Sequence, residues 1–230
     1  MNIGGILDVS TLDFPGKICS VVFFSGCPFR CPYCHNYEIV LNKGIDVDVK
    51  YVISKISNNF LIDGVCLTGG EPLMQDLNEL KELILKIKDV GLSVKLDTNG
   101  YFPNKLSKLI SLVDYVAMDF KTVPENYYSV TGRSDSANKV LESLKVLSDS
   151  STEYEIRTTV VPTIIDKSGI IKIAEILSEY NVKRYVLQQF RNEKTLDKKF
   201  RNISPYPKEY LFEIAREVKK FIPEVEVRSE

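Results

Sequence analysis

Short apolar runs alternate along this chain with longer stretches in which hydrophobic residues recur at helical spacing. The runs are rich in β-branched and aromatic residues and are flanked by turn signals, which is typical of buried strands. They cover residues 17–25, 64–68, 92–97, 115–120, 154–161 and 184–190. The stretches between them predict amphipathic helices. Their apolar stripes are Leu77, Leu80, Leu83, Ile84 and Ile87, then Val140, Leu144 and Leu147, and then Ile170, Ile173, Ala174 and Leu177.

Strands that each lead into a helix predict a parallel sheet with right-handed crossovers. Both a partial (β/α)6 barrel and an open doubly wound sheet are built from this unit, and the apolar pattern does not distinguish them. A final helix is expected over 208–221, after the turn SPYP. Because 230 residues fit one domain, we expect 1–230 to form a single α/β domain.

Composition and charge exclude several classes of function. A formal net charge of -1 gives the chain no overall attraction to nucleic acid or anionic lipid. No stretch approaches the roughly 18 apolar residues of a membrane helix, and no secretion leader is evident. We therefore expect a cytoplasmic protein with neither nucleic acid nor membrane as a partner. A basic region at 183–208, with Glu193 and Asp197 as its acidic residues, predicts a solvated face or a docking site for a protein.

The cysteines divide into two groups. Cys19 and Cys66 lie inside apolar runs, where free cysteine behaves as a small hydrophobic residue, so we expect both to serve packing. The other three lie in CPFRCPYC at 27–34, directly after the first predicted strand, with the spacing Cys-x3-Cys-x2-Cys. Without a secretion signal, thiolate chemistry is the better interpretation than a disulfide framework.

Three thiolates on so short a loop can hold one compact iron–sulfur cluster and leave one iron atom without a protein ligand. A structural zinc ion needs four ligands. His35 would then be the fourth, but it follows Cys34 directly and can seldom turn onto the same ion, so we expect His35 to be a loop residue. A zinc-stabilised binding module remains the non-enzymatic alternative. An open coordination position, by contrast, is typical of a site that reacts.

Glycines and charged residues follow the predicted strands at their carboxyl ends, where the functional loops of parallel sheets gather. They are Gly69, Gly70 and Glu71 after the second strand, Asp97 and Thr98 at the end of the third, and Asp119 and Lys121 at the end of the fourth. All should face one cavity. Arg157, on the fifth strand, shares a face with Thr159 and needs an anion, for which Glu71 or a bound carboxylate is a candidate. A structural ion pair is the competing interpretation.

A family resemblance adds to these residues. Cys27, Cys31 and Cys34, with Tyr33 before the last cysteine, resemble the signature of radical S-adenosylmethionine (SAM) enzymes, and GGEP at 69–72 strengthens the likeness. A narrower resemblance covers nearly the whole chain. The segments GILDVSTLDFPGKICSVVFFSGCPFRCPYCHN, LTGGEPLMQ, LDTNGY, MDFKT and YVLQQFRNEKTLD are similar to activating proteins of glycyl radical enzymes, in particular the anaerobic ribonucleoside-triphosphate reductase activating type.

The resemblance implies a partial (β/α)6 barrel in which Cys27, Cys31 and Cys34 ligate a 4Fe-4S cluster. An enzyme of this kind cleaves SAM reductively to a 5'-deoxyadenosyl radical. In the activating type, the radical takes a hydrogen atom from a glycine of a partner enzyme. Here the expected partner is anaerobic ribonucleoside-triphosphate reductase, and a flavodoxin or ferredoxin is the expected electron donor. The enzymatic alternative is a small-molecule radical SAM enzyme, such as a relative of 7-carboxy-7-deazaguanine synthase.

The resemblance also assigns the SAM contacts. Tyr33 would lie against the adenine, and the backbone of Gly69 and Gly70 would meet the methionine ammonium group together with Glu71. The remaining expected SAM contacts are Asp97, Thr98, Asp119, Lys121, Arg157 and Gln188. Related activating enzymes bind a monovalent cation through residues equivalent to Asp97, Thr98 and Asp119, which makes such a cation a further expectation here. Simpler structural interpretations stay open, namely loop packing for Tyr33 and a turn for the glycines.

Overall fold

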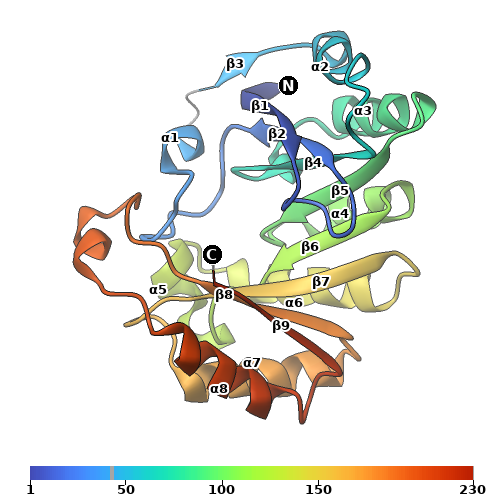
Figure 1. Ribbon diagram of the computed structural model, residues 1–230. Coiled ribbons are helices and arrows are strands. Elements are labelled where there is room, and N and C mark those ends of the chain that lie inside the picture. Colours follow the sequence, from blue (N-terminus) through green and yellow to red (C-terminus); the bar gives the residue numbers. More distant parts are fainter. Residues whose placement is uncertain (42–43, 230) are drawn as a thin grey trace.

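The computed structural model describes residues 1–41 and 44–229, and in this part of the chain one nine-stranded sheet forms in the order β3-β1-β2-β4-β5-β6-β7-β8-β9. Figure 1 shows its strong curvature. The strands are β1 Asn2–Ser10, β2 Cys19–Phe24, β3 Ile45–Asp46, β4 Gly64–Gly69, β5 Ser93–Thr98, β6 Tyr115–Asp119, β7 Glu153–Val160, β8 Arg184–Gln189 and β9 Glu224–Arg228. From β2 through β9 the neighbouring strands in the sheet are parallel.

Every strand expected from the apolar runs is present, as β2 and β4 to β8. The sheet continues beyond them at both edges. β1 pairs with β2 in antiparallel register, β3 pairs with β1, and β9 adds a parallel strand beside β8. These edge strands lack the apolar signature because they are half-exposed: β1 contains two glycines and β9 reads EVEVR. A fold of six strands was therefore too small an expectation.

The described residues form the helices α1 Tyr37–Val40, α2 Val49–Ile56, α3 Leu77–Asp89, α4 Pro103–Leu109, α5 Tyr127–Thr131, α6 Ser136–Ser148, α7 Lys167–Glu179 and α8 Lys208–Val218. The short helix α1 borders the cavity, which Val40 lines. The predicted final helix ends three residues early, at Val218, with Lys219 as its C-cap. The long helices α3, α6, α7 and α8 cover the outer face of the sheet (Figure 1). Within the described residues, the two edge strands β3 and β9 do not pair with each other. The sheet is therefore an incomplete barrel.

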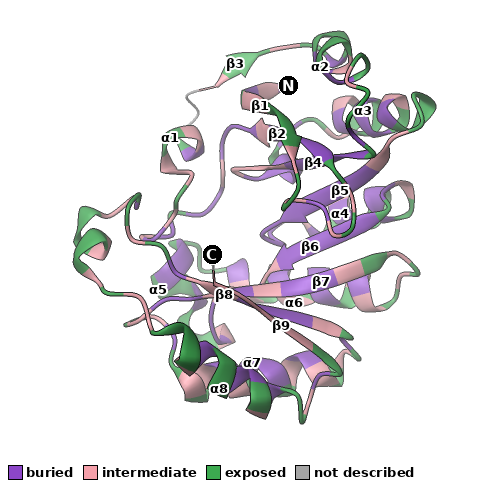
Figure 2. Ribbon diagram, in the orientation of Figure 1, coloured by how far each residue is buried: buried purple, intermediate pink, exposed green. Residues whose placement is uncertain are grey.

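The main core fills the space between the outer face of the sheet and the helices, as the buried elements in Figure 2 show. The apolar stripe of α3 is fully buried at Leu80, Leu83, Ile84 and Ile87. A smaller apolar cluster contains Cys19 and Cys66, both 0% exposed, together with Phe14 and Tyr115. The prediction that these two cysteines serve packing is confirmed.

No helix in the described residues is both long enough and apolar enough to cross a membrane.

Candidate active site

A cavity of about 860 Å³ lies within the curve of the sheet, at the carboxyl ends of the parallel strands. Of the residues expected at the site, its wall contains Cys27, Cys31, Cys34, Tyr33, Gly69, Gly70, Asp97, Thr98, Asp119, Lys121, Arg157 and Gln188. His35 also lies on the wall. The structure thus brings together residues from six separate segments of the chain, as parallel strands with loops at one end require. Glu71 is the one expected residue that does not line the cavity.

The cysteine loop presents its thiols to the cavity. Cys27, Cys31 and Cys34 are all free, and a turn between the last two is closed by the bond from the Cys34 N–H to the Cys31 carbonyl at 3.1 Å. Burial raises the pKa of the Cys27 thiol to about 12 and that of the Cys31 thiol to about 11. Buried thiols hold their protons until a metal displaces them, and iron–sulfur clusters bind cysteine as thiolate. The donor set fits such a cluster.

The arrangement of the thiols differs from that of a mononuclear metal centre. Within residues 1–41 and 44–229, no three histidine, cysteine or acidic side chains are gathered as one metal ion requires. A four-iron cluster distributes its thiolates over different iron atoms, so cysteines that serve it need not converge on one point. Asn99 donates from Nδ2 to the Cys27 sulfur at 3.4 Å. Hydrogen bonds to sulfur are among the features that tune iron–sulfur sites, and a contact of Asn99 with a cysteine was not predicted from the sequence.

The backbone at Gly69 and Gly70 packs closely against the backbone of the segment that precedes the cysteine loop. Gly69 has φ +114, and a Cβ on Gly70 would lie 2.1 Å from the Gly26 carbonyl oxygen. The N–H of Gly70 donates to the Phe24 carbonyl and that of Glu71 to the Gly26 carbonyl, both at 2.8 Å. Only glycine allows so close an approach of two backbones. The turn after β4 therefore fixes the segment that leads into the first cysteine.

Glu71 lies behind the cavity wall and is 0% exposed. Its carboxylate accepts hydrogen bonds from the Thr98 hydroxyl at 2.8 Å, the Asn99 N–H at 2.7 Å and the Leu73 N–H at 3.1 Å. Burial raises the pKa of Glu71 to about 7, although these hydrogen bonds oppose the shift. Through these bonds Glu71 positions the segment that carries Asn99. A contact of Glu71 with SAM, which the family resemblance implies, stays a prediction.

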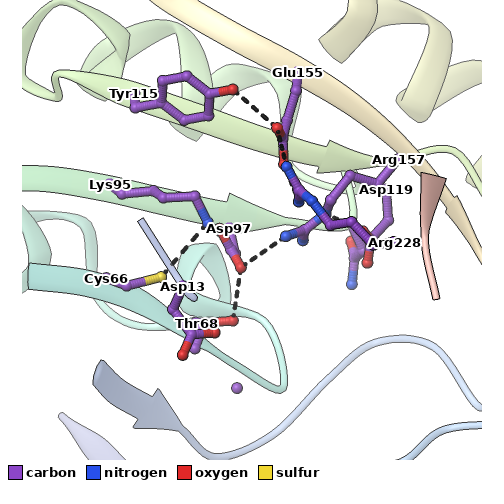
Figure 3. Close-up of polar contacts among 12 residues, drawn as sticks. Asp13, Cys66, Thr68, Lys95, Asp97, Tyr115, Asp119, Glu155, Arg157 and Arg228 are labelled. Atoms are coloured by element: carbon purple, nitrogen blue, oxygen red, sulfur yellow. Dashed lines mark hydrogen bonds and ion pairs between the residues drawn. The ribbon is translucent and has the colours of Figure 1, made fainter. Parts of the chain in front are cut away.

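Charged residues on β5, β6 and β7 form the floor of the cavity (Figure 3). Arg157 donates from NH1 to Asp97 at 3.1 Å and from Nε to Asp119 at 3.0 Å. Lys121 reaches the other oxygen of Asp119 at 3.1 Å, and Lys95 bonds the other oxygen of Asp97. Arg157 therefore pairs with two aspartates and not with Glu71, which was one of its two candidate anions. The competing interpretation of a structural ion pair is confirmed, and a contact of Arg157 with a bound carboxylate stays a prediction.

The two floor aspartates are held in their charged form. Burial would raise the pKa of Asp97, but Arg157 and Lys95 outweigh it, and the pKa lies below its ordinary value. The same balance, with Lys121 and Arg157 as the cations, lowers the pKa of Asp119. Each oxygen of these two carboxylates already has a basic partner. The expected monovalent cation would therefore share these oxygens with their basic partners, as Thr68 already shares one Asp97 oxygen with Arg157.

A second ion-pair network joins β6, β7, β8 and β9. Glu155 is 0% exposed. Its carboxylate accepts a hydrogen bond from each of the two terminal nitrogens of the Arg228 guanidinium, both at 2.8 Å, and one from the Tyr115 hydroxyl at 2.9 Å. Arg184 bonds Glu226 at 2.7 Å. Arg184, Glu226 and Arg228 all line the cavity. The network ties β9 to the sheet. Sequence reasoning missed it because β9 was not predicted, although the alternation in EVEVR places Glu226 and Arg228 on one face.

Comparisons with known proteins agree with this site. Residues 21–175 match the radical SAM superfamily. A protein of Methanocaldococcus jannaschii, provisionally named as a glycyl-radical enzyme activating enzyme, is 35% identical over 99% of this chain and 95% of its own length. The pyruvate formate-lyase-activating enzyme of Clostridium pasteurianum is 29% identical over 96% of this chain and 98% of its own.

Among solved structures, SuiB of Streptococcus suis bound to S-adenosylmethionine superimposes with a TM-score of 0.65 over 91% of this chain, at 13% identity. This chain spans about half of SuiB, 51% of its length, so the likeness shows the shared fold alone. That fold is the partial barrel expected from the sequence. The chain belongs to the radical SAM superfamily, whose members use a 4Fe-4S cluster and SAM, and within it to the glycyl-radical enzyme activating enzymes.

Proposed function

We propose that this chain activates a glycyl radical enzyme by removing a hydrogen atom from a glycine of that partner, and that the partner is anaerobic ribonucleoside-triphosphate reductase. The observation that carries the proposal is one cavity that is lined both by three free thiols and by a charged floor. When bound, the cluster supplies an electron that cleaves SAM, and the resulting 5'-deoxyadenosyl radical abstracts the hydrogen atom. A flavodoxin or ferredoxin is the proposed source of that electron.

The residues of the chain have distinct tasks in this proposal. Cys27, Cys31 and Cys34 hold the cluster from one side of the cavity, and Tyr33 offers an aromatic surface beside them. The floor combines three cations, Lys95, Lys121 and Arg157, with two aspartates, which leaves one positive charge in excess. An excess cation in a poorly solvated cavity suits the methionine carboxylate of SAM. The SAM contacts inferred from the family resemblance remain predictions of this proposal.

The shape of the sheet supports a protein substrate. The cavity wall extends from Val40, beside one edge of the sheet, to Ser229, beside the other. Because β3 and β9 do not pair with each other within the described residues, the barrel is not closed between these two places. A glycine on a loop of a second protein therefore has a lateral route to the reacting atoms. Support for the particular partner comes from sequence segments such as MDFKT and YVLQQFRNEKTLD, which are similar to the reductase-activating type.

The test is anaerobic incubation of the reduced, cluster-loaded protein with SAM and a candidate partner, followed by electron paramagnetic resonance. We expect a glycyl radical on anaerobic ribonucleoside-triphosphate reductase and none on pyruvate formate-lyase. Cys34→Ala is the negative control, since it removes one cluster ligand. A radical on pyruvate formate-lyase alone would change the partner but keep the activating function. Turnover of a small molecule with no radical on either protein would contradict the proposal.

A further inference from the structure

We propose that the outer side of the cysteine loop, together with the basic loop at 190–205, forms the docking surface for an acidic one-electron carrier protein. We use the term electron-entry face for this surface, which consists of Arg30, Arg133, Lys194, Lys198, Lys199 and Arg201. The inference rests on the proposed function, because it concerns the route by which the cluster is reduced.

The cysteine loop has two sides with different exposures. Cys27, Phe29, Cys31 and Tyr33 line the cavity, whereas the residues that alternate with them, Pro28, Arg30 and Pro32, do not. Arg30 is exposed, and its NH1 donates to the carbonyls of Cys27 at 2.6 Å and Phe29 at 2.8 Å. The cysteines therefore lie on the cavity side of the loop, while on its reverse side Pro28 is buried, Pro32 is half-buried and the Arg30 cation is exposed to solvent.

Two other segments are fastened to this reverse side. Arg133, in the turn between α5 and α6, donates from Nε to the Pro28 carbonyl at 3.0 Å. The N–H of Asp197 donates to the Pro32 carbonyl at 2.9 Å, which joins the 190–205 loop to the centre of the cysteine loop. Figure 1 shows the orange 190–205 loop beside the blue cysteine loop. A basic region far along the sequence is thus placed directly behind the cluster ligands.

The exposed charge on this face is mainly positive, with Glu193 as the exposed acidic residue of the 190–205 loop. Lys194, Lys198, Lys199 and Arg201 are exposed, and no carboxylate in the described part of the chain forms an ion pair with any of them. Asp197 is half-buried and its carboxylate accepts the Lys199 N–H at 2.9 Å. The whole chain has a formal charge of only -1, so this positive surface is local. Local surfaces of one sign steer partners of the opposite sign.

The position of the face indicates an electron carrier rather than the radical-bearing partner. The glycine of that partner must enter the cavity, where the thiols and the charged floor lie. An electron can cross the backbone of the cysteine loop and needs no opening. One electron leaves a flavin hydroquinone, which becomes a semiquinone, and the oxidised cluster held by the three cysteines gains it. Separate entry points allow both proteins to bind this chain without competing.

The test compares two double variants of the reconstituted, cluster-loaded protein that carry the same change in charge. K198E/K199E alters the electron-entry face, and K81E/K108E alters exposed lysines on α3 and α4. Binding of oxidised flavodoxin is measured by titration calorimetry at low and high salt, and reduction by flavodoxin hydroquinone is followed by rapid mixing. We expect K198E/K199E to weaken binding and slow reduction by about tenfold at low salt, with the difference shrinking as salt is added.

Dithionite separates this inference from the proposed function, because this small reductant needs no docking surface. We expect dithionite to reduce both variants and the unaltered protein equally, and we expect SAM cleavage to follow in all three. If dithionite-reduced protein does not cleave SAM, the proposed function fails. Equal flavodoxin binding by both variants, or binding of the unaltered protein that is indifferent to salt, overturns the docking surface. Normal flavodoxin binding with lost activation of the partner enzyme overturns it too and assigns the face to that partner.

Discussion

The two sides of the cavity are built in opposite ways. On the cysteine side, backbone groups hold the loop, through the bonds from Gly70 and Glu71 to the segment before Cys27, and the thiols themselves are free. On the floor, ion pairs between side chains stabilise the arrangement, and each carboxylate oxygen of Asp97 and Asp119 has a basic partner. The cysteines form no disulfide, and Asn99 donates a hydrogen bond to Cys27, whereas the charged groups of the floor are paired with one another.

This difference separates the residues that the chain needs in order to fold from those that it needs in order to bind a cluster. Buried charges are costly unless they are paired, so the floor must be complete before any ligand arrives. The thiols, which are neutral at their raised pKa values, are stable without partners. We therefore expect substitutions in the floor to destabilise the protein, and substitutions of the cysteines to remove the cluster while leaving the fold unchanged.

The largest effect is expected from Arg157→Met. The substitution removes the cation shared by Asp97 and Asp119 and leaves two largely buried carboxylates with one basic partner each. We expect a loss of about 3 kcal/mol in the free energy of unfolding of the apoprotein, measured by urea titration. Adding Asp119→Asn to this variant should recover part of the loss, because it removes one unpaired charge. A fully stable Arg157→Met protein would contradict the description of the floor.

Gly70→Ala tests the backbone contact that holds the cysteine side. The added Cβ would lie 2.1 Å from the Gly26 carbonyl oxygen, which belongs to rigid backbone. We expect a loss of about 2 kcal/mol in unfolding free energy and poor retention of iron after reconstitution. Gly5→Ala is the matched control, since a Cβ there meets nothing within 4 Å. Equal behaviour of the two variants would show that the turn after β4 does not fix the loop.

Glu71 bonds both to the segment before Cys27 and to Thr98 at the end of β5. Because its pKa is raised, we expect the stability of the protein to depend on pH. Its pKa rises from the ordinary 4.5 to about 7 in the folded protein, so the folded state binds this proton more tightly than the unfolded state. Stability from Glu71 is therefore complete below the ordinary pKa and is lost as the pH rises through 7. The expected slope is on the order of 1 kcal/mol per pH unit between these values.

Unfolding of the apoprotein and of Glu71→Gln at a series of pH values measures this contribution. The variant should be less stable at low pH, since an amide nitrogen cannot accept the hydrogen bond from the Asn99 N–H, whereas the hydroxyl oxygen of the protonated carboxyl keeps acceptor capacity. Its stability should nevertheless change less with pH in that window. Parallel curves for the two proteins would show that Glu71 does not titrate there.

The smallest effect on stability is expected from Cys34→Ser. The thiol is half-buried and free, so the serine variant should unfold within about 0.5 kcal/mol of the unaltered apoprotein. Iron content and the visible absorbance of the reconstituted cluster should fall sharply at the same time. A large loss of stability without any change in iron content would reverse the roles given to the two sides of the cavity.

The fold was predictable where burial is complete. Strands such as β2 and β4 carry nearly continuous apolar runs because most of their residues are buried on both faces of the sheet. Strands β1 and β9 are half-exposed and carry glycines or alternating charges, so their signal is weak. The apolar pattern also could not decide between the two sheet architectures, because closure depends on the curvature of the whole sheet rather than on any one unit.

The sequence predicted which residues lie near the site better than it predicted which side chains face the cavity. The expected residues do gather at the strand ends, but sequence alone did not show that the turn at Gly69 and Gly70 directs Glu71 away from the cavity. Lys95 was missed although it lies two residues before Asp97 and therefore shares its face of β5. A lysine inside an apolar strand was the available signal. The contact of Asn99 with Cys27 depends on tertiary packing and left no signal in the sequence.

The central claim is that three thiols on one wall hold a cluster with one iron atom left for SAM. The most direct measurement is electron paramagnetic resonance of the anaerobically reconstituted, dithionite-reduced protein before and after SAM is added, with iron and zinc measured on the same sample. We predict about four iron atoms per chain, as a single 4Fe-4S cluster requires, and a spectrum that changes when SAM binds. One zinc ion without iron, or a cluster spectrum indifferent to SAM, would contradict the claim.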